Sequence, residues 1–79
     1  MPQTYSLKLA HGPFGDETRS TSQLDSEADA MRMGRLLLEH AAKTNPSPNG
    51  LSVLIGIEGG DDPQWLGAWH WDGAPKWVV

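Results

Sequence analysis

Alternation of apolar and polar residues predicts most of the strands in this chain. Residues 4–10 place Tyr5, Leu7 and Leu9 on one side, the period-two pattern of a strand with one buried face. Residues 51–58 alternate in the same way and are the most hydrophobic strand, which we expect at the centre of the sheet. Residues 17–23 are almost wholly polar, so this segment is either a solvated edge strand paired with the first strand or a loop, and we favour the edge strand.

The helix is predicted from residue 26 to about residue 43. Ser26 can cap the free backbone amides, and Glu27 and Asp29 place negative charge in the first turn, where the helix dipole favours it. Glu39 and Lys43 have the spacing of an ion pair one turn apart. The apolar arc that should face the sheet consists of Ala30, Met31, Gly34, Leu37, Leu38 and Ala41. Two prolines between residues 45 and 50 end the helix.

All four tryptophans lie in the last sixteen residues, 64–79. Strict alternation over residues 64–72 puts Trp65, Gly67, Trp69 and Trp71 on one face of a strand, with Leu66, Ala68, His70 and Asp72 on the other. An acidic, glycine-rich turn at residues 59–63 leads into this strand. A second turn at residues 72–75 leads to a short last strand, residues 76–79, which carries Trp77.

These elements predict an α+β fold in one domain, residues 1–79. It has two layers, a mainly antiparallel sheet of four or five strands and one amphipathic helix packed on one face. If strand 4–10 and strand 51–58 are neighbours, we expect them to run parallel and to be joined by a right-handed helical crossover.

Composition bounds the class of protein. A chain of 79 residues is near the lower end of what one hydrophobic core can stabilise, which leaves room for a homodimer. There is no cysteine, so no disulfide or thiolate metal site is expected. The first residues do not resemble a signal peptide, and no segment approaches the roughly 18 apolar residues that a membrane span requires. We therefore expect a soluble, cytoplasmic protein that does not enter a membrane.

Charge is distributed unevenly along the chain. The net charge is -4. Residues 1–45 carry five basic and six acidic residues, whereas in residues 46–79 Lys76 stands alone against four acids, Glu58, Asp61, Asp62 and Asp72. Phosphate binding needs clustered Lys or Arg, so direct binding of nucleic acid, including stacking of bases on tryptophan, is disfavoured. An acidic half favours a partner with a basic surface.

The tryptophans divide by their expected role. Trp69 and Trp71 are expected to pack under the helix, where small residues face them. Trp65, near the acidic turn, and Trp77, in the last strand, are the better candidates for contact with a partner, because tryptophan is enriched among residues that anchor interfaces. Met33, Leu36 and His40 lie beside the apolar arc of the helix, so Leu36 and His40 are candidates for a second, helix-borne contact.

No residue set predicts catalysis. The three histidines, His11, His40 and His70, lack the spacing of a metal site, and Asp61 with Asp62 is explained as a solvated turn. Serines lie in turns, caps and polar strands, where they have ordinary structural roles. We expect neither an enzyme nor a bound metal or cofactor.

The leading hypothesis is a non-enzymatic inhibitor or binding protein that docks on another protein or protein complex. Its contacts would be Trp65, Trp77, Asp61, Asp62, Asp72, Leu36 and His40. In size and charge the chain resembles small acidic phage-encoded inhibitors such as anti-CRISPR proteins, which implies that it could block a basic nucleic-acid-binding surface. The alternative is a homodimeric domain with a structural or small-molecule-binding role at its dimer interface.

Overall fold

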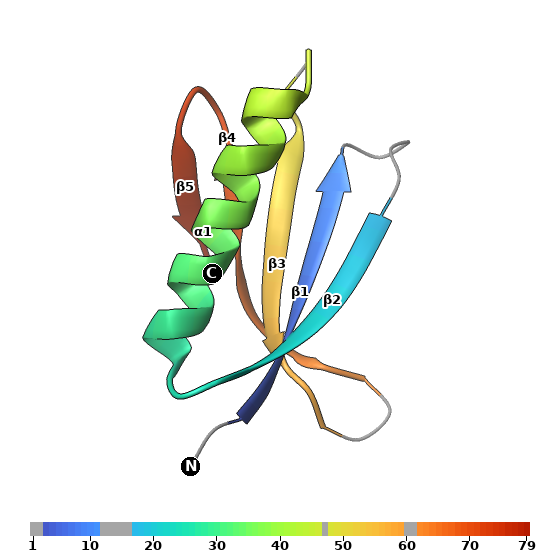
Figure 1. Ribbon diagram of the computed structural model, residues 1–79, viewed down its shortest axis with the longest axis vertical. Coiled ribbons are helices and arrows are strands. Elements are labelled where there is room, and N and C mark those ends of the chain that lie inside the picture. Colours follow the sequence, from blue (N-terminus) through green and yellow to red (C-terminus); the bar gives the residue numbers. More distant parts are fainter. Residues whose placement is uncertain (1–2, 12–16, 47, 60–61) are drawn as a thin grey trace.

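The structure is a computed structural model that describes residues 3–11, 17–46, 48–59 and 62–79. Over these residues it consists of one five-stranded sheet with one helix packed on a single face (Figure 1). In chain order the elements are β1 (Gln3–His11), β2 (Glu17–Leu24), α1 (Glu27–Thr44), β3 (Leu51–Ile57), β4 (Gln64–Trp71) and β5 (Pro75–Val78). The predicted α+β fold and the edge strand β2 are thereby confirmed. The turns predicted after His11 and before β4 fall partly outside the described residues.

The strands are arranged in the order β2-β1-β3-β4-β5, and every neighbouring pair is antiparallel. The central position predicted for β3 is confirmed. The expectation that β1 and β3 run parallel is wrong, because β2 reverses the chain before the helix begins. The helix therefore links β2 to β3, which run in the same direction on either side of β1.

The ends of α1 follow from local chemistry. Ser26 is the N-cap, and its Oγ accepts a hydrogen bond from the backbone N–H of Asp29 at 3.3 Å. Glu39 does not pair with Lys43 as expected: it accepts a hydrogen bond from Nε of Arg35 at 3.1 Å, one turn earlier. The buried positions of the helix are Ala30, Gly34, Leu38 and Ala42, so the buried arc lies slightly to one side of the predicted one.

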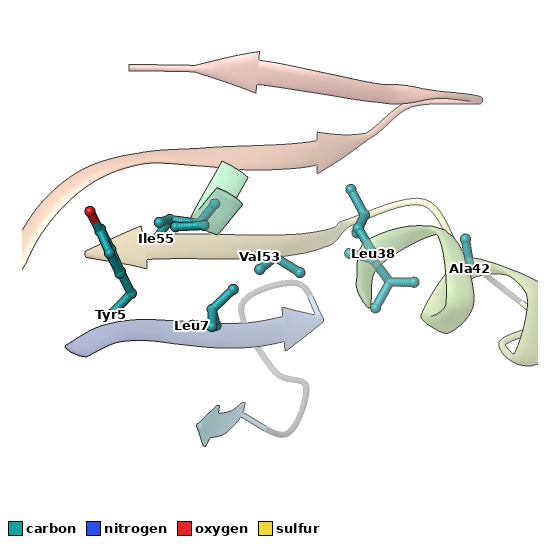
Figure 2. Packing of buried hydrophobic residues seen from close by; sticks show 8 residues of the cluster. Tyr5, Leu7, Leu38, Ala42, Val53 and Ile55 are labelled. Atoms are coloured by element: carbon teal, nitrogen blue, oxygen red, sulfur yellow. The ribbon is translucent and has the colours of Figure 1, made fainter. Parts of the chain in front are cut away.

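The core lies between α1 and the three strands β1, β3 and β4. Figure 2 shows Tyr5 and Leu7 of β1 beside Val53 and Ile55 of β3, with Leu38 of α1 packed near them. Gly34 allows the close approach of helix and sheet, because a β-carbon there would be 2.6 Å from Cδ1 of Ile55. The helix therefore packs closely on the sheet where the small Gly34 faces the large Ile55.

A β-bulge changes which face of the sheet Trp65 occupies. The register between β3 and β4 shifts between Ile55 and Gly56, so that Ile55 lies opposite Gly67 and Gly56 lies opposite Trp65. Side chains of directly opposed residues share a face, and Gly56 lies on the face away from the helix. Trp65 is thus separated from Trp69 and Trp71, and the prediction that all three share a face is wrong.

Candidate protein-binding surfaces

The face of the sheet opposite α1 carries an apolar groove over β3, β4 and β5. We call this face the open face, because none of the described elements covers it (Figure 1). The groove has a volume of about 360 Å³, and its lining residues are Leu54, Trp65, Leu66, Gly67, Ala68, His70, Val78 and Val79. Trp65 is 42% exposed and Val78 is 49% exposed. Large apolar side chains in a hollow of this kind are typical of a contact surface.

The other half of the open face, over β1 and β2, is polar, and its charged side chains form ion pairs. Nζ of Lys8 lies 3.1 Å from a carboxylate oxygen of Glu17, and the guanidinium of Arg19 pairs with Glu58. Nε of Arg19 also donates a hydrogen bond of 2.9 Å to Oγ of Ser6, which is fully buried. This half has its charges compensated within the chain, so the apolar half is the better candidate for contact.

Trp77 lies on the same side of the sheet as the helix, together with Trp69 and Trp71. The rings of Trp77 and Trp69 meet edge to face, with centroids 5.3 Å apart. The ring of Trp77 covers Gly67, where a β-carbon would be 2.6 Å from Cζ2. Nε1 of Trp69 donates a hydrogen bond of 2.8 Å to the backbone oxygen of Met31 in α1. Trp77 is half-buried, so it belongs with Trp69 and not with Trp65.

The candidate acidic residues are placed differently from one another. Asp72, in the turn between β4 and β5, accepts a hydrogen bond from Nζ of Lys76 at 3.1 Å. Asp62 is exposed, three residues before Trp65. Asp61 lies outside the described residues. Since Glu58 is paired with Arg19, two of the four acids in the second half of the chain have a basic partner that charge counting missed.

Leu36 and His40 lie on the outer surface of α1, away from the sheet. Leu36 is 58% exposed and Met33 is 39% exposed. A shallow apolar groove of about 230 Å³ lies beside them, and its lining residues are Leu24, Asp29, Arg32, Met33 and Leu36. The predicted contact residues therefore form no single site: Trp65 lies on the open face, while Leu36 and His40 lie on the opposite side of the molecule.

A third groove, of about 300 Å³, separates the last turns of α1 from the turn between β4 and β5. Its lining residues are Glu39, Ala42, Lys43, Trp71, Gly73, Ala74 and Pro75.

In the part of the chain that the structure describes, no three His, Asp or Glu side chains come together as a metal site would require. Within the same residues, no helix has the length and apolar character needed to cross a membrane.

Sequence reasoning missed the apolar lining of the open face. Register places Leu54, Ala68 and Val78 side by side across three strands, on the face that alternation assigns to polar residues. A signal was present, since β3, β4 and β5 each carry an apolar residue at a position expected to face solvent. The uncovered face of an antiparallel sheet is usually polar, so apolar residues at neighbouring positions on three strands are unusual for a face exposed to solvent.

Comparison of the sequence with protein-family models gave no match, and searches of curated proteins and of solved structures likewise found no similar protein.

Proposed function

We propose that this chain is a small, non-enzymatic binding protein that docks on another protein through the apolar half of its open face. The observation that carries the proposal is the position of Trp65, which the β-bulge turns out of the helix layer and into the groove of the open face. A tryptophan that only filled the core would lie under α1, as Trp69 does. A large, half-exposed ring beside a groove is the kind of residue that anchors an interface.

Charge favours a partner with a basic surface. The chain has a net charge of -4, and Asp62 is exposed close to the start of β4. The ion pairs at Glu58 and Asp72 reduce the acidic character of this region, so the contact should depend mainly on apolar burial and only partly on charge. A basic residue of the partner near Asp62 would set orientation and the rate of association. A protein that docks in this way can block a basic nucleic-acid-binding surface, as the size and charge of the chain suggest.

The test is affinity capture with immobilised wild-type protein and three variants, with bound proteins identified by quantitative mass spectrometry. Trp65→Ala removes the proposed anchor, and Val78→Lys places a charge in the groove without touching the buried core. Leu36→Lys is the matched control, because Leu36 is also a large exposed residue but lies on the other side of the molecule. Far-UV circular dichroism checks that every variant is folded.

We expect one set of proteins to be captured by the wild type and by Leu36→Lys but not by the two groove variants. For the purified partner, Trp65→Ala should weaken binding about thirtyfold or more, which corresponds to about 2 kcal/mol at an anchoring residue. Capture that is equal for wild type and Val78→Lys would contradict the proposal. Loss of capture only in Leu36→Lys would move the contact to the helix.

A further inference from the structure

A line of exposed and partly exposed residues runs along the outer surface of α1, on the side away from the sheet. Its members are Asp29, Met33, Leu36, His40 and Lys43, separated in turn by four, three, four and three residues. We call this line the outer stripe. At 100° per residue these five positions stay within a narrow arc, opposite the buried arc centred between Gly34 and Leu38. The alternation of four and three is the spacing of a seam between two packed helices.

The outer stripe is apolar at its centre and charged at its ends. Leu36 is 58% exposed and lies at the midpoint of α1, and Met33 beside it is 39% exposed. The first turn is acidic, with Glu27 and Asp29, and the last turn carries the basic Lys43. The groove of about 230 Å³ beside Met33 and Leu36 can receive side chains from a facing helix.

This distribution of charge is complementary to itself. If a second copy of α1 packs antiparallel about a two-fold axis at Leu36, the two Leu36 side chains meet at the axis. Asp29 then lies opposite Lys43 of the second copy, and the same pair forms again at the other end. The two helix dipoles are then antiparallel, which is the favourable arrangement. A parallel arrangement would instead place acidic turns together and basic turns together, so only the antiparallel one fits.

We propose that the outer stripe of α1 is a self-association surface on which two copies of this chain form an antiparallel helix pair. The proposal is independent of the function proposed above, because the stripe and the open face lie on opposite sides of the two-layer fold. A dimer formed in this way would leave both open faces accessible. With one helix from each copy, the contact lies at the small end of specific interfaces, and we expect dissociation constants in the micromolar range.

Ion pairs within the helix do not oppose this arrangement. Asp29 accepts a hydrogen bond from Arg32 at 3.0 Å, but both groups are solvent-accessible, and an exposed pair of this kind contributes little. Asp29 can therefore exchange this partner for Lys43 of the second copy. Lys43 has no ion pair among the described residues of its own chain.

The first experiment is sedimentation equilibrium over a wide range of concentration. The wild type should pass from one chain to two, and Leu36→Lys should remain a monomer throughout. Asp29→Lys and Lys43→Asp should each weaken the dimer at least tenfold, and the double variant should regain affinity to within about threefold of the wild type, because exchanging the charges restores both pairs. Circular dichroism shows whether each variant keeps its helix.

The second experiment uses the absence of natural cysteine. Leu36→Cys should be joined to itself by a short bis-maleimide at concentrations where the wild type is dimeric, because the axis brings the two positions together. Val78→Cys, on the open face with similar exposure, is the matched control and should react far less.

Three results would overturn the proposal. The first is a wild type that stays monomeric at every concentration. The second is a dimer whose affinity is unchanged by Leu36→Lys. Preferential cross-linking through Val78→Cys would place self-association on the open face instead. The capture experiment described above is decided by the open-face variants Trp65→Ala and Val78→Lys, whereas self-association is decided by variants of α1, so failure of one proposal leaves the other separately testable.

Discussion

The indole ring of Trp65 lies over Gly56 of the neighbouring strand. A β-carbon at Gly56 would be 2.8 Å from Cε3 of Trp65 and 3.0 Å from the backbone oxygen of Gln64. The ring therefore occupies the space that a side chain at position 56 would fill. This contact holds Trp65 against the sheet beside the other residues that line the open-face groove, while 42% of the residue stays exposed.

Gly56→Ala should destabilise the protein, because the added methyl group would crowd both the ring of Trp65 and the backbone carbonyl of Gln64. We expect a loss of about 1–3 kcal/mol in the free energy of unfolding, typical of overpacking. Urea denaturation followed by circular dichroism measures it. Gly59→Ala is the matched control, since beyond its chain neighbours no atom of the described residues lies within 4 Å of a β-carbon there, and its effect should stay within about 0.5 kcal/mol. Equal stability of the two variants would contradict the packing described for Trp65.

Gly34→Ala should also destabilise the protein, although alanine is favoured over glycine inside a helix by about 1 kcal/mol. The added methyl group would be 2.6 Å from Cδ1 of Ile55, whose side chain points from the sheet toward the helix. Ile55→Val removes that carbon. In a double-mutant cycle, the two substitutions together should cost less than the sum of their separate costs by at least about 0.5 kcal/mol. Additive costs would mean that helix and sheet are not in contact at this point.

Trp69→Phe should cost more stability than Trp65→Phe. The first substitution removes the hydrogen bond to the Met31 oxygen and reduces the ring contact with Trp77. We expect the free energy of unfolding to fall by about 1–3 kcal/mol. The second changes a half-exposed ring and should cost less than about 1 kcal/mol. Thermal or urea unfolding of the two variants decides the comparison. A larger loss for Trp65→Phe would reverse the assignment of core and surface.

Arg19→Met should lower the free energy of unfolding, because it leaves the buried hydroxyl of Ser6 without its partner. Without the guanidinium, Oγ of Ser6 loses its hydrogen-bond donor, and an unsatisfied buried polar group costs about 1–3 kcal/mol. Adding Ser6→Ala should then recover part of the loss, because the unpaired oxygen is removed. Chemical denaturation of the single and double variants provides the measurement. A double variant no more stable than Arg19→Met would show that the ion pair with Glu58, and not Ser6, gives Arg19 its effect.

Local sequence determined the elements of this fold. Period-two alternation in β1 and β3, the cap at Ser26 and the prolines after α1 each act through a few neighbouring residues, so they can be recognised without knowing the tertiary structure. The small residue at position 34 also indicated which side of the helix meets large side chains. The candidate surface on α1 was visible for the same reason, because helical periodicity places Leu36 beside the apolar arc.

Tertiary structure alone decided which tryptophan faces outward. The direction of β3 depends on β2 being a strand, and the face occupied by Trp65 depends on a bulge that shifts register within one ladder. The partners of Glu58 and Ser6 come from β2, 39 and 13 residues away, so charge counting along the chain could not identify them. Alternation describes a strand only while its register is regular. Because an extra residue enters β4, Trp69, Trp71 and Trp77 lie on the helix side of the sheet and Trp65 lies on the open face.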